Sequence, residues 1–329
     1  MIPVSVVTGF LGSGKTTLIG RVLRTPGFAR TAVIVNEFGE IGLDHDLIAS
    51  SDETLLALTT GCLCCAVRGD LVETLIDLML RRDAGDIAFD RVLIETSGLA
   101  DPAPILHALM TDRGVSAVYR IDSVVTVVDA VHGGTTLDRH IEARRQVALA
   151  DRLVLSKTDL ADGTALWACL SAINPGADFS FAAATTPDLL FSSADPAARA
   201  ARLVRLPEQE AAALSPFARG RHTDGIETFA IQRDTPLPAL ALTLLLQALT
   251  EHCGDRLLRV KGLVDIAEIP DRPAVIHGVQ HVFSEPVFLD AWPSDDRSTR
   301  IVFIVRGVPR HFPARLLAAI EEEVRDANE

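Results

Sequence analysis

A glycine-rich segment near the start of the chain constrains the fold more strongly than any other feature. Residues 9–16 read GFLGSGKT and fit the phosphate-loop (P-loop) template G-x-x-x-x-G-K-[ST] at every fixed position. The apolar run at residues 4–7 predicts a buried strand before the loop, and a helix is expected after it. In that context, backbone N–H groups and a helix N-terminus bind phosphate. We therefore expect Lys15 to reach the β- and γ-phosphates of a nucleotide, and the Thr16 hydroxyl to bind Mg²⁺.

Apolar strands alternate with amphipathic helices over residues 1–190, which we expect to form one domain. Strands are predicted at residues 4–7, 32–35, 55–58, 92–94, 124–128 and 153–155, and helices at 16–23, 69–81, 102–110, 138–149 and 163–173. This alternation predicts an α/β fold with a doubly wound, mostly parallel sheet. Ligands bind at the carboxyl edge of such a sheet. Each motif below follows a predicted strand and should lie on that edge.

The pattern changes in the second half of the chain. Residues 191–224 are rich in Ala, Pro, Arg and Glu and are predicted to connect two domains. Residues 225–329 are predicted to form a smaller α+β domain. Its strands are expected at residues 226–231, 257–266, 274–283 and 299–305, and its helices at 237–251 and 313–325.

Composition narrows the classes of function. The net charge is −13, with 31 basic against 44 acidic residues. An acidic balance argues against nucleic-acid binding, which needs a basic face. No apolar tract approaches the ~18 residues of a membrane span, and the N-terminus does not resemble a secretion signal. We expect a cytoplasmic protein that binds neither nucleic acid nor membrane.

The segment SKTD at residues 156–159 favours guanine as the base. It matches the N-K-x-D guanine motif in Lys157, Asp159 and their spacing. Asp159 would accept hydrogen bonds from N1–H and N2–H₂ of guanine, a donor pair that adenine lacks. Lys157 would lie over the base, and Ser156 replaces the usual Asn, which removes one amide that braces the loop. The alternative is a polar turn in which Asp159 caps a helix.

Two further acidic segments follow predicted strands. In ETSG, residues 95–98, Glu95 is expected to approach Mg²⁺ and the N–H of Gly98 to sense the γ-phosphate. Leu99 stands where Ras-like proteins carry a glutamine that positions water, so hydrolysis is expected to be slow or to use another residue. In NEFGE, residues 36–40, Glu37 could reach Mg²⁺, position water or bind a second metal, or be a solvated loop acid.

Three of the five cysteines lie within four residues, at Cys62, Cys64 and Cys65. Three soft thiolates in one turn of chain suit Zn²⁺, Cu⁺ or an iron–sulfur unit. A closed zinc site normally has four ligands, so this one would stay open. Redox-active thiols and ordinary buried cysteines are the alternatives. Cys169 and Cys253 fall in apolar helical patterns and are expected to be small core residues.

In this order the motifs resemble those of the CobW-like metallochaperone GTPases, relatives of HypB and UreG within the P-loop GTPase superfamily. The resemblance rests on residues 8–17, 36–39, 61–65, 95–98 and 156–159, and continues at 225–228, 259–262 and 277–281. It implies a P-loop GTPase domain with a smaller α+β domain. It also implies GTP-dependent delivery of a transition metal, usually zinc or cobalt, to a client protein.

Carried over residue by residue, the resemblance implies that Cys62, Cys64 and Cys65 bind the metal. It assigns guanine to Lys157 and Asp159, and Mg²⁺ to Thr16 and Glu95. The phosphates would be bound by Gly12, Ser13, Gly14, Lys15, Thr16 and Thr17. The nine histidines form no rich stretch. His277 and His281 could lie on one side of a strand and meet a metal or client, or be ordinary polar residues of the second domain.

The sequence therefore predicts a GTPase metallochaperone in which Lys15, Glu37 and Glu95 are catalytic. GTP binding would close a loop over the thiol site, and hydrolysis to GDP and phosphate would release the metal to a client. Zinc is the expected metal, with cobalt delivery in cobalamin biosynthesis as the alternative. A P-loop small-molecule kinase and a metal sensor that binds GTP without hydrolysing it are alternatives of other classes. A homodimer is left open.

Overall fold

The computed structural model describes residues 1–25, 28, 30–35, 66–186 and 225–327. The chain divides into two compact units, residues 1–169 with 177–193 and residues 170–176 with 194–329. The predicted connecting segment, residues 191–224, lies outside the described residues, as does the predicted strand at residues 55–58.

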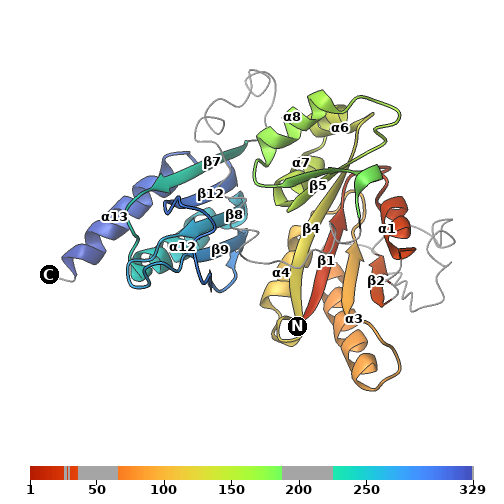
Figure 1. Ribbon diagram of the computed structural model, residues 1–329, viewed down its shortest axis with the longest axis horizontal. Coiled ribbons are helices and arrows are strands. Elements are labelled where there is room, and N and C mark those ends of the chain that lie inside the picture. The colour runs from red at the N-terminus through yellow and green to blue at the C-terminus, as the bar shows by residue number, and fades with distance from the viewer. Residues whose placement is uncertain (26–27, 29, 36–65, 187–224, 328–329) are drawn as a thin grey trace. The chain divides into compact units, whose positions relative to one another are not determined.

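The described part of the first unit is built on a parallel sheet with the strand order β2-β3-β1-β4-β5-β6 (Figure 1). The strands are β1 (Ile2–Thr8), β2 (Thr31–Val35), β3 (Arg91–Glu95), β4 (Tyr119–Asp129), β5 (Arg152–Ser156) and β6 (Asp178–Phe181). The helices are α1 (Lys15–Leu23), α3 (Ala66–Asp83), α4 (Ala103–Thr111), α5 (Arg113–Ser116), α6 (Gly133–Arg139), α7 (Ile141–Leu149), the short η1 (Ala182–Ala184) and α8 (Thr164–Ile173), whose residues from 170 on are assigned to the second unit. The predicted α/β class with a parallel sheet is confirmed.

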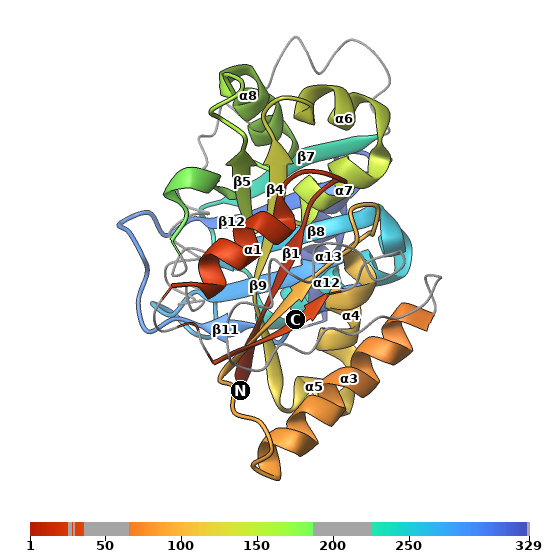
Figure 2. The ribbon, with the colours of Figure 1, turned by 90° about the vertical axis from the view of Figure 1, so that its right-hand side faces the viewer.

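Strand β1 lies at the centre of this sheet, between β3 and β4. Because all its strands are parallel, the loops that follow β1, β3, β4 and β5 leave from one edge. Helix α1 covers one face, where Leu18, Ile19 and Val22 pack against Val7 and Leu93. Figure 2 looks onto this face, with α1 in front of the strands. The sheet thus holds the P-loop helix beside the edge where the motifs at residues 95–98 and 156–159 begin.

Three expectations for the first unit are corrected. The helix predicted at residues 138–149 is two helices, α6 and α7, separated by His140, whose backbone is extended (φ −127°, ψ 114°). The elements α5, β6 and η1 were missed, because three or four residues are too few to give a periodic pattern. Cys169 is exposed, whereas Cys253 is buried as expected. Helix α8 is apolar on most sides, so its sequence does not reveal which face is covered.

The described part of the second unit has an antiparallel sheet of order β10-β9-β8-β12-β7, with β11 beside β9. Helices α12 and α13 pack on one face of the sheet, around the stacked rings of Phe229 and Phe303. This confirms the smaller α+β domain. No described helix is long and apolar enough to cross a membrane. The elements are β7 (Ile226–Arg233), α12 (Ala239–Cys253), η3 (Gly254–Arg256), β8 (Leu257–Val264), β9 (Ala274–Val279), β10 (Val282–Phe283), β11 (Val287–Phe288), β12 (Thr299–Arg306) and α13 (Phe312–Asp326).

The single strand predicted at residues 274–283 is wrong, because the segment folds into the hairpin β9–β10. The turn contains Gln280, whose φ is +51°, and His281. The sequence does not indicate this turn, since Gln-His is not one of the Asn-Gly or Asp-Gly pairs that signal two-residue hairpins. His277 lies in β9 and His281 in the turn, so the two do not share one side of a strand.

Tyr119 joins helix α3 to strand β4 and is the only tyrosine of the chain. Its hydroxyl donates a hydrogen bond to the carbonyl oxygen of Leu75 at 2.8 Å, and the residue is 1% exposed. Burial raises the pKa of Tyr119 from 10.0 to about 12, with Arg82 opposing and Asp83 reinforcing the shift.

Ultraviolet titration of the folded protein should therefore show a phenol pKa of about 12. Because the folded pKa lies above the unfolded one, Tyr119 stabilises the fold fully below pH 10 and loses this effect as the pH rises toward 12. We expect Tyr119→Phe to lower the free energy of unfolding at pH 7 by about 1–2 kcal/mol, since the buried hydrogen bond to the Leu75 carbonyl is lost. Calorimetric unfolding checks this, and equal stability of the two proteins would contradict it.

Candidate functional site

The P-loop, residues 9–14, connects β1 to α1 and lies directly on the neighbouring strand. A Cβ atom on Gly9 would stand 2.3 Å from the carbonyl oxygen of Val127 in β4, so only glycine fits there. Gly14 is the N-cap residue of α1, with φ +95° in the left-handed region. The N-terminus of α1 therefore faces the loop, where it favours an anion.

Lys15 is the first residue of α1 and is buried. Its Nζ donates to the carbonyl oxygens of Gly9 at 3.0 Å and Phe10 at 3.4 Å. The ammonium group thus lies along the loop backbone, beside the N–H groups that would wrap a phosphate. Lys15 is in place to meet negative charge without a change in the path of the backbone.

Thr16 and Glu95 meet although 79 residues separate them in the chain. The Thr16 hydroxyl donates to Oε1 of Glu95 at 2.8 Å. Glu95 ends β3 and is 4% exposed, and β3 lies beside β1 in the sheet. A hydroxyl and a carboxylate together are hard oxygen ligands of the kind that Mg²⁺ takes beside a nucleotide phosphate. These residues fit the magnesium ion that the P-loop implies.

The turn after Glu95 lies against the P-loop. A Cβ atom on Gly98 would stand 2.7 Å from the backbone nitrogen of Leu11. The backbone N–H of Thr96 donates to the carbonyl oxygen of Val7 at 3.0 Å, and the Thr96 hydroxyl donates to that of Thr8 at 2.8 Å. Gly98 is thus held at backbone distance from the loop that would carry the phosphates.

Ser156 ends β5 and contacts the P-loop from another side. Its hydroxyl donates to the carbonyl oxygen of Ser13 at 2.6 Å and is buried. The sequence predicted that replacing Asn by Ser removes a bracing amide. The structure shows that the serine hydroxyl itself braces the loop.

Lys157 follows Ser156 with φ +54°, and its Nζ lies 2.6 Å from Oδ2 of Asp129 at the end of β4. Oδ1 of Asp129 accepts the backbone N–H of Val131 at 2.7 Å and of His132 at 3.3 Å. Burial raises the pKa of Asp129, but the Lys157 hydrogen bond and the two N–H donors outweigh it, so the pKa is lowered from 3.8. Asp159 is exposed two residues further on.

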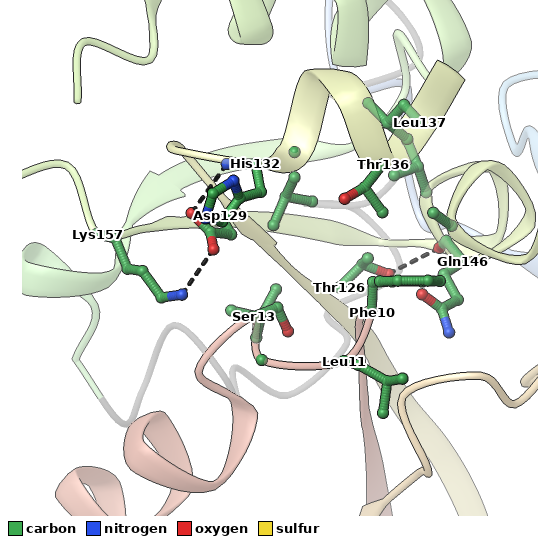
Figure 3. A pocket seen from close by; sticks show the side chains of 16 residues that line it. Phe10, Leu11, Ser13, Thr126, Asp129, His132, Thr136, Leu137, Gln146 and Lys157 are labelled. Atoms are coloured by element: carbon green, nitrogen blue, oxygen red, sulfur yellow. Dashed lines mark hydrogen bonds and ion pairs between the residues drawn. The ribbon is translucent and has the colours of Figure 1, made fainter. Parts of the chain in front are cut away.

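A cavity of about 110 Å³ opens beside the P-loop. The loop, the end of β4, α6 and α7 line it, and its wall includes Asp129, Lys157 and Gln146 (Figure 3). Sequence reasoning missed Asp129 and Gln146. Asp129 had a signal, because a carboxylate directly after an apolar strand is the pattern that pointed to Glu95. Gln146 had none, since glutamine in a helix is usually solvated.

Four other predicted site residues are not among those that the structure describes. Glu37, Cys62, Cys64 and Cys65 lie outside the described residues. Within the described ranges, no group of three or more His, Cys, Asp or Glu is arranged to hold a metal ion.

The sheet order and these contacts define a P-loop nucleotide-binding domain. Residues 3–180 match the family model for the CobW/HypB/UreG nucleotide-binding domain, and residues 226–321 match that for the cobalamin synthesis protein cobW C-terminal domain. The chain therefore belongs to the CobW/HypB/UreG family.

Several relatives are zinc chaperones. The zinc chaperone YjiA of Escherichia coli (strain K12) is 32% identical over 332 residues, covering 99% of this chain and 97% of that protein. The zinc chaperone CobW of a Sinorhizobium species is 37% identical over 193 residues, 50% of this chain and 53% of that protein. The crystal structure of Zn(II)-bound YjiA GTPase from E. coli matches with a TM-score of 0.71 and 27% identity, covering 97% of this chain and 98% of that one. The chain is thus homologous to the zinc chaperone YjiA over nearly its full length.

Replacing Asp129 by Asn tests the Asp129–Lys157 pair. Because the folded pKa of Asp129 is lowered, its carboxylate stabilises the fold above pH 3.8 and loses this effect as the pH falls through the lower folded value. Asp129→Asn should lower the free energy of unfolding at pH 7, because the ion pair with Lys157 is lost. The expected loss is only about 1 kcal/mol, since solvent screens the partly exposed Lys157. The difference should shrink below pH 3.8. Calorimetry over a pH series checks this, and a difference independent of pH would contradict it.

Proposed function

We propose that this protein is a GTP-hydrolysing metallochaperone that binds zinc and delivers it to a client metalloprotein. The observation that carries the proposal is the convergence of Lys15, Thr16 and Glu95 at one edge of the parallel sheet. An ammonium, a hydroxyl and a carboxylate beside a P-loop suit a triphosphate with its magnesium ion. Similarity to the zinc chaperone YjiA over 97% of that protein supports the metal-delivery part.

Residues of the P-loop, of α1 and of the turn after β3 would each contact a different part of the nucleotide phosphates and their magnesium ion. Lys15 would exchange the Gly9 and Phe10 carbonyls for the β- and γ-phosphate oxygens. Thr16 and Glu95 would hold Mg²⁺, which when bound withdraws charge from the phosphoryl group being transferred. The N–H of Gly98 would meet the γ-phosphate. The remaining phosphate contacts would come from the N–H groups of Gly12, Ser13, Gly14 and Thr17.

The loop after β5 would select guanine. Asp159 is exposed and can accept from N1–H and N2–H₂ of guanine, whereas adenine would leave the carboxylate without donors. Lys157 is held by Asp129 at the wall of the cavity, and its stem would cover the base. Ser156 ties this loop to the P-loop, so base and phosphate contacts are set by one backbone framework.

Replacing Asp159 by Asn should move base preference from guanine to xanthine. The Asn amide can donate to the 2-oxo group of xanthine and accept from its N1–H, but it cannot accept from both guanine donors. We expect GTP hydrolysis at limiting concentration to fall by about tenfold or more, with a gain for XTP. Steady-state phosphate release with each nucleotide measures this. Asp162→Asn makes the same charge change nearby, where Asp162 caps α8, and should leave the preference for GTP unchanged.

Zinc is proposed to bind to Cys62, Cys64 and Cys65, because three thiolates suit Zn²⁺ and the similar proteins are named zinc chaperones rather than cobalt chaperones. Glu37 is proposed to position water or contact the metal ion of the nucleotide site. Since the cysteines lie in sequence between the P-loop and Glu95, GTP binding is proposed to change the zinc site. Linkage then requires zinc to change GTP affinity by the same factor.

A triple variant, Cys62/Cys64/Cys65→Ser, tests the metal site. Its zinc content after dialysis against a zinc buffer should fall from about one ion per chain to near zero, because hydroxyls bind Zn²⁺ far more weakly than thiolates. GDP affinity should stay unchanged. Cys169→Ser is the matched control, since Cys169 is exposed and outside the cluster, and it should bind zinc like the wild type. Unchanged zinc content in the triple variant would leave a plain GTPase.

A further inference from the structure

The turn that follows Glu95 is tied to helix α7 by one buried side chain. Gln146 is 1% exposed, and its Nε2 donates to the carbonyl oxygen of Gly98 at 3.2 Å and of Ala100 at 2.9 Å. The amide has two N–H bonds, and each meets one carbonyl. The reverse orientation would set the amide oxygen against two carbonyl oxygens, so the two contacts fix which way the amide points.

A second tether lies next to the first. Arg145 precedes Gln146 on α7, and its Nη1 donates to Oδ2 of Asp101 at 3.1 Å. Residues 98–101 are therefore held to α7 at three points. On its other side the turn contacts the P-loop, where Gly98 leaves no room for a Cβ atom beside Leu11.

Helix α7 is itself fixed to the sheet and to the P-loop. The carbonyl oxygen of Gln146 accepts from the Thr126 hydroxyl of β4 at 2.7 Å. The ring of His140, at the N-terminus of α7, lies 4.5 Å from that of Phe10 in the P-loop. Figure 3 shows Gln146 and Phe10 at the same side of the cavity. The helix is thus a rigid support on which the turn rests.

The turn needs such a support because of its glycine. Gly98 has no Cβ atom to restrict its backbone, so hydrogen bonds must restrict it instead. Within the turn, the Ala100 N–H donates to the carbonyl oxygen of Ser97 at 3.0 Å, and the contacts with α7 add restraints from outside. Fixing the carbonyl oxygens of Gly98 and Ala100 restricts the peptides that follow the Gly98 N–H. A hydrogen-bond donor that is already oriented toward a developing charge stabilises that charge more than a donor that must reorient.

We propose that Gln146 is a positioning residue that holds the turn at residues 98–100 in the orientation that recognises the γ-phosphate, with Arg145 as a second tether. The inference rests on the proposed GTPase function and deepens it. GDP has no γ-phosphate, so GDP binding does not use the turn. Gln146 therefore sets the discrimination between GTP and GDP and the rate of hydrolysis, although it touches no nucleotide.

The test compares Gln146→Met with Tyr119→Phe. Gln146→Met keeps the length of the side chain and removes both N–H donors. Tyr119→Phe removes a buried hydrogen bond elsewhere in the first unit, between α3 and β4, and leaves Gln146 and its partners unchanged. On the full chain we would measure the affinities for GDP and a non-hydrolysable GTP analogue, kcat and KM for GTP, and the unfolding temperature.

For Gln146→Met we expect kcat and analogue affinity to fall by about tenfold or more, with GDP affinity within about twofold of the wild type. Tyr119→Phe should lower the unfolding temperature and keep the GTP-to-GDP affinity ratio. Equal losses of GDP and analogue affinity in Gln146→Met, or an unchanged ratio, would overturn the proposal. Should Gln146→Met not fold, Arg145→Gln is measured instead, and an unchanged ratio there overturns it equally.

Wild-type measurements separate this inference from the function on which it rests. If the wild type releases no phosphate from GTP, the proposed function fails. If the wild type hydrolyses GTP and Gln146→Met keeps its GTP-to-GDP ratio, only the role of Gln146 fails.

Discussion

The P-loop edge of the parallel sheet depends on backbone segments that approach one another more closely than side chains allow. Gly9 lies on the Val127 carbonyl of β4, and Gly98 lies on the Leu11 backbone of the P-loop. The Ser156 hydroxyl reaches the loop from β5. The loop after β1 is therefore positioned by the ends of its neighbours in the sheet. Because these contacts involve backbone or short side chains, the position of the phosphate site is tightly restricted.

The site attracts an anion through local positive charge, although the chain as a whole is negatively charged. A net charge of −13 gives no long-range attraction for an anionic nucleotide. Attraction must come from the N–H groups of the loop, the N-terminus of α1 and Lys15. The acidic groups nearby already have partners, since Asp129 pairs with Lys157 and Glu95 accepts from Thr16. Groups held in this way need little reorganisation when a ligand binds.

Much of the fold could be predicted because its core strands are short apolar runs. The runs at residues 4–7, 92–94 and 153–155 became β1, β3 and β5, each lengthened by one or two residues at its ends. Short elements such as β6 were missed, since four residues carry no period. The break between α6 and α7 at His140 was also missed, because His140 is not a residue type that signals a helix end or a cap.

The sequence by itself determined the chemistry that this edge offers: the loop glycines, Lys15, Thr16, Glu95 and the Ser156–Asp159 turn are each recognisable within a few residues. Only the tertiary structure decided which of these groups touch and what supports them. It paired Lys157 with Asp129, turned the Ser156 hydroxyl onto the P-loop and set the Gln146 amide on the turn after Glu95. The physical reason is distance along the chain. A motif is a local pattern, whereas a contact such as that between Gln146 and Gly98 exists only once strand order and helix packing have brought two segments together.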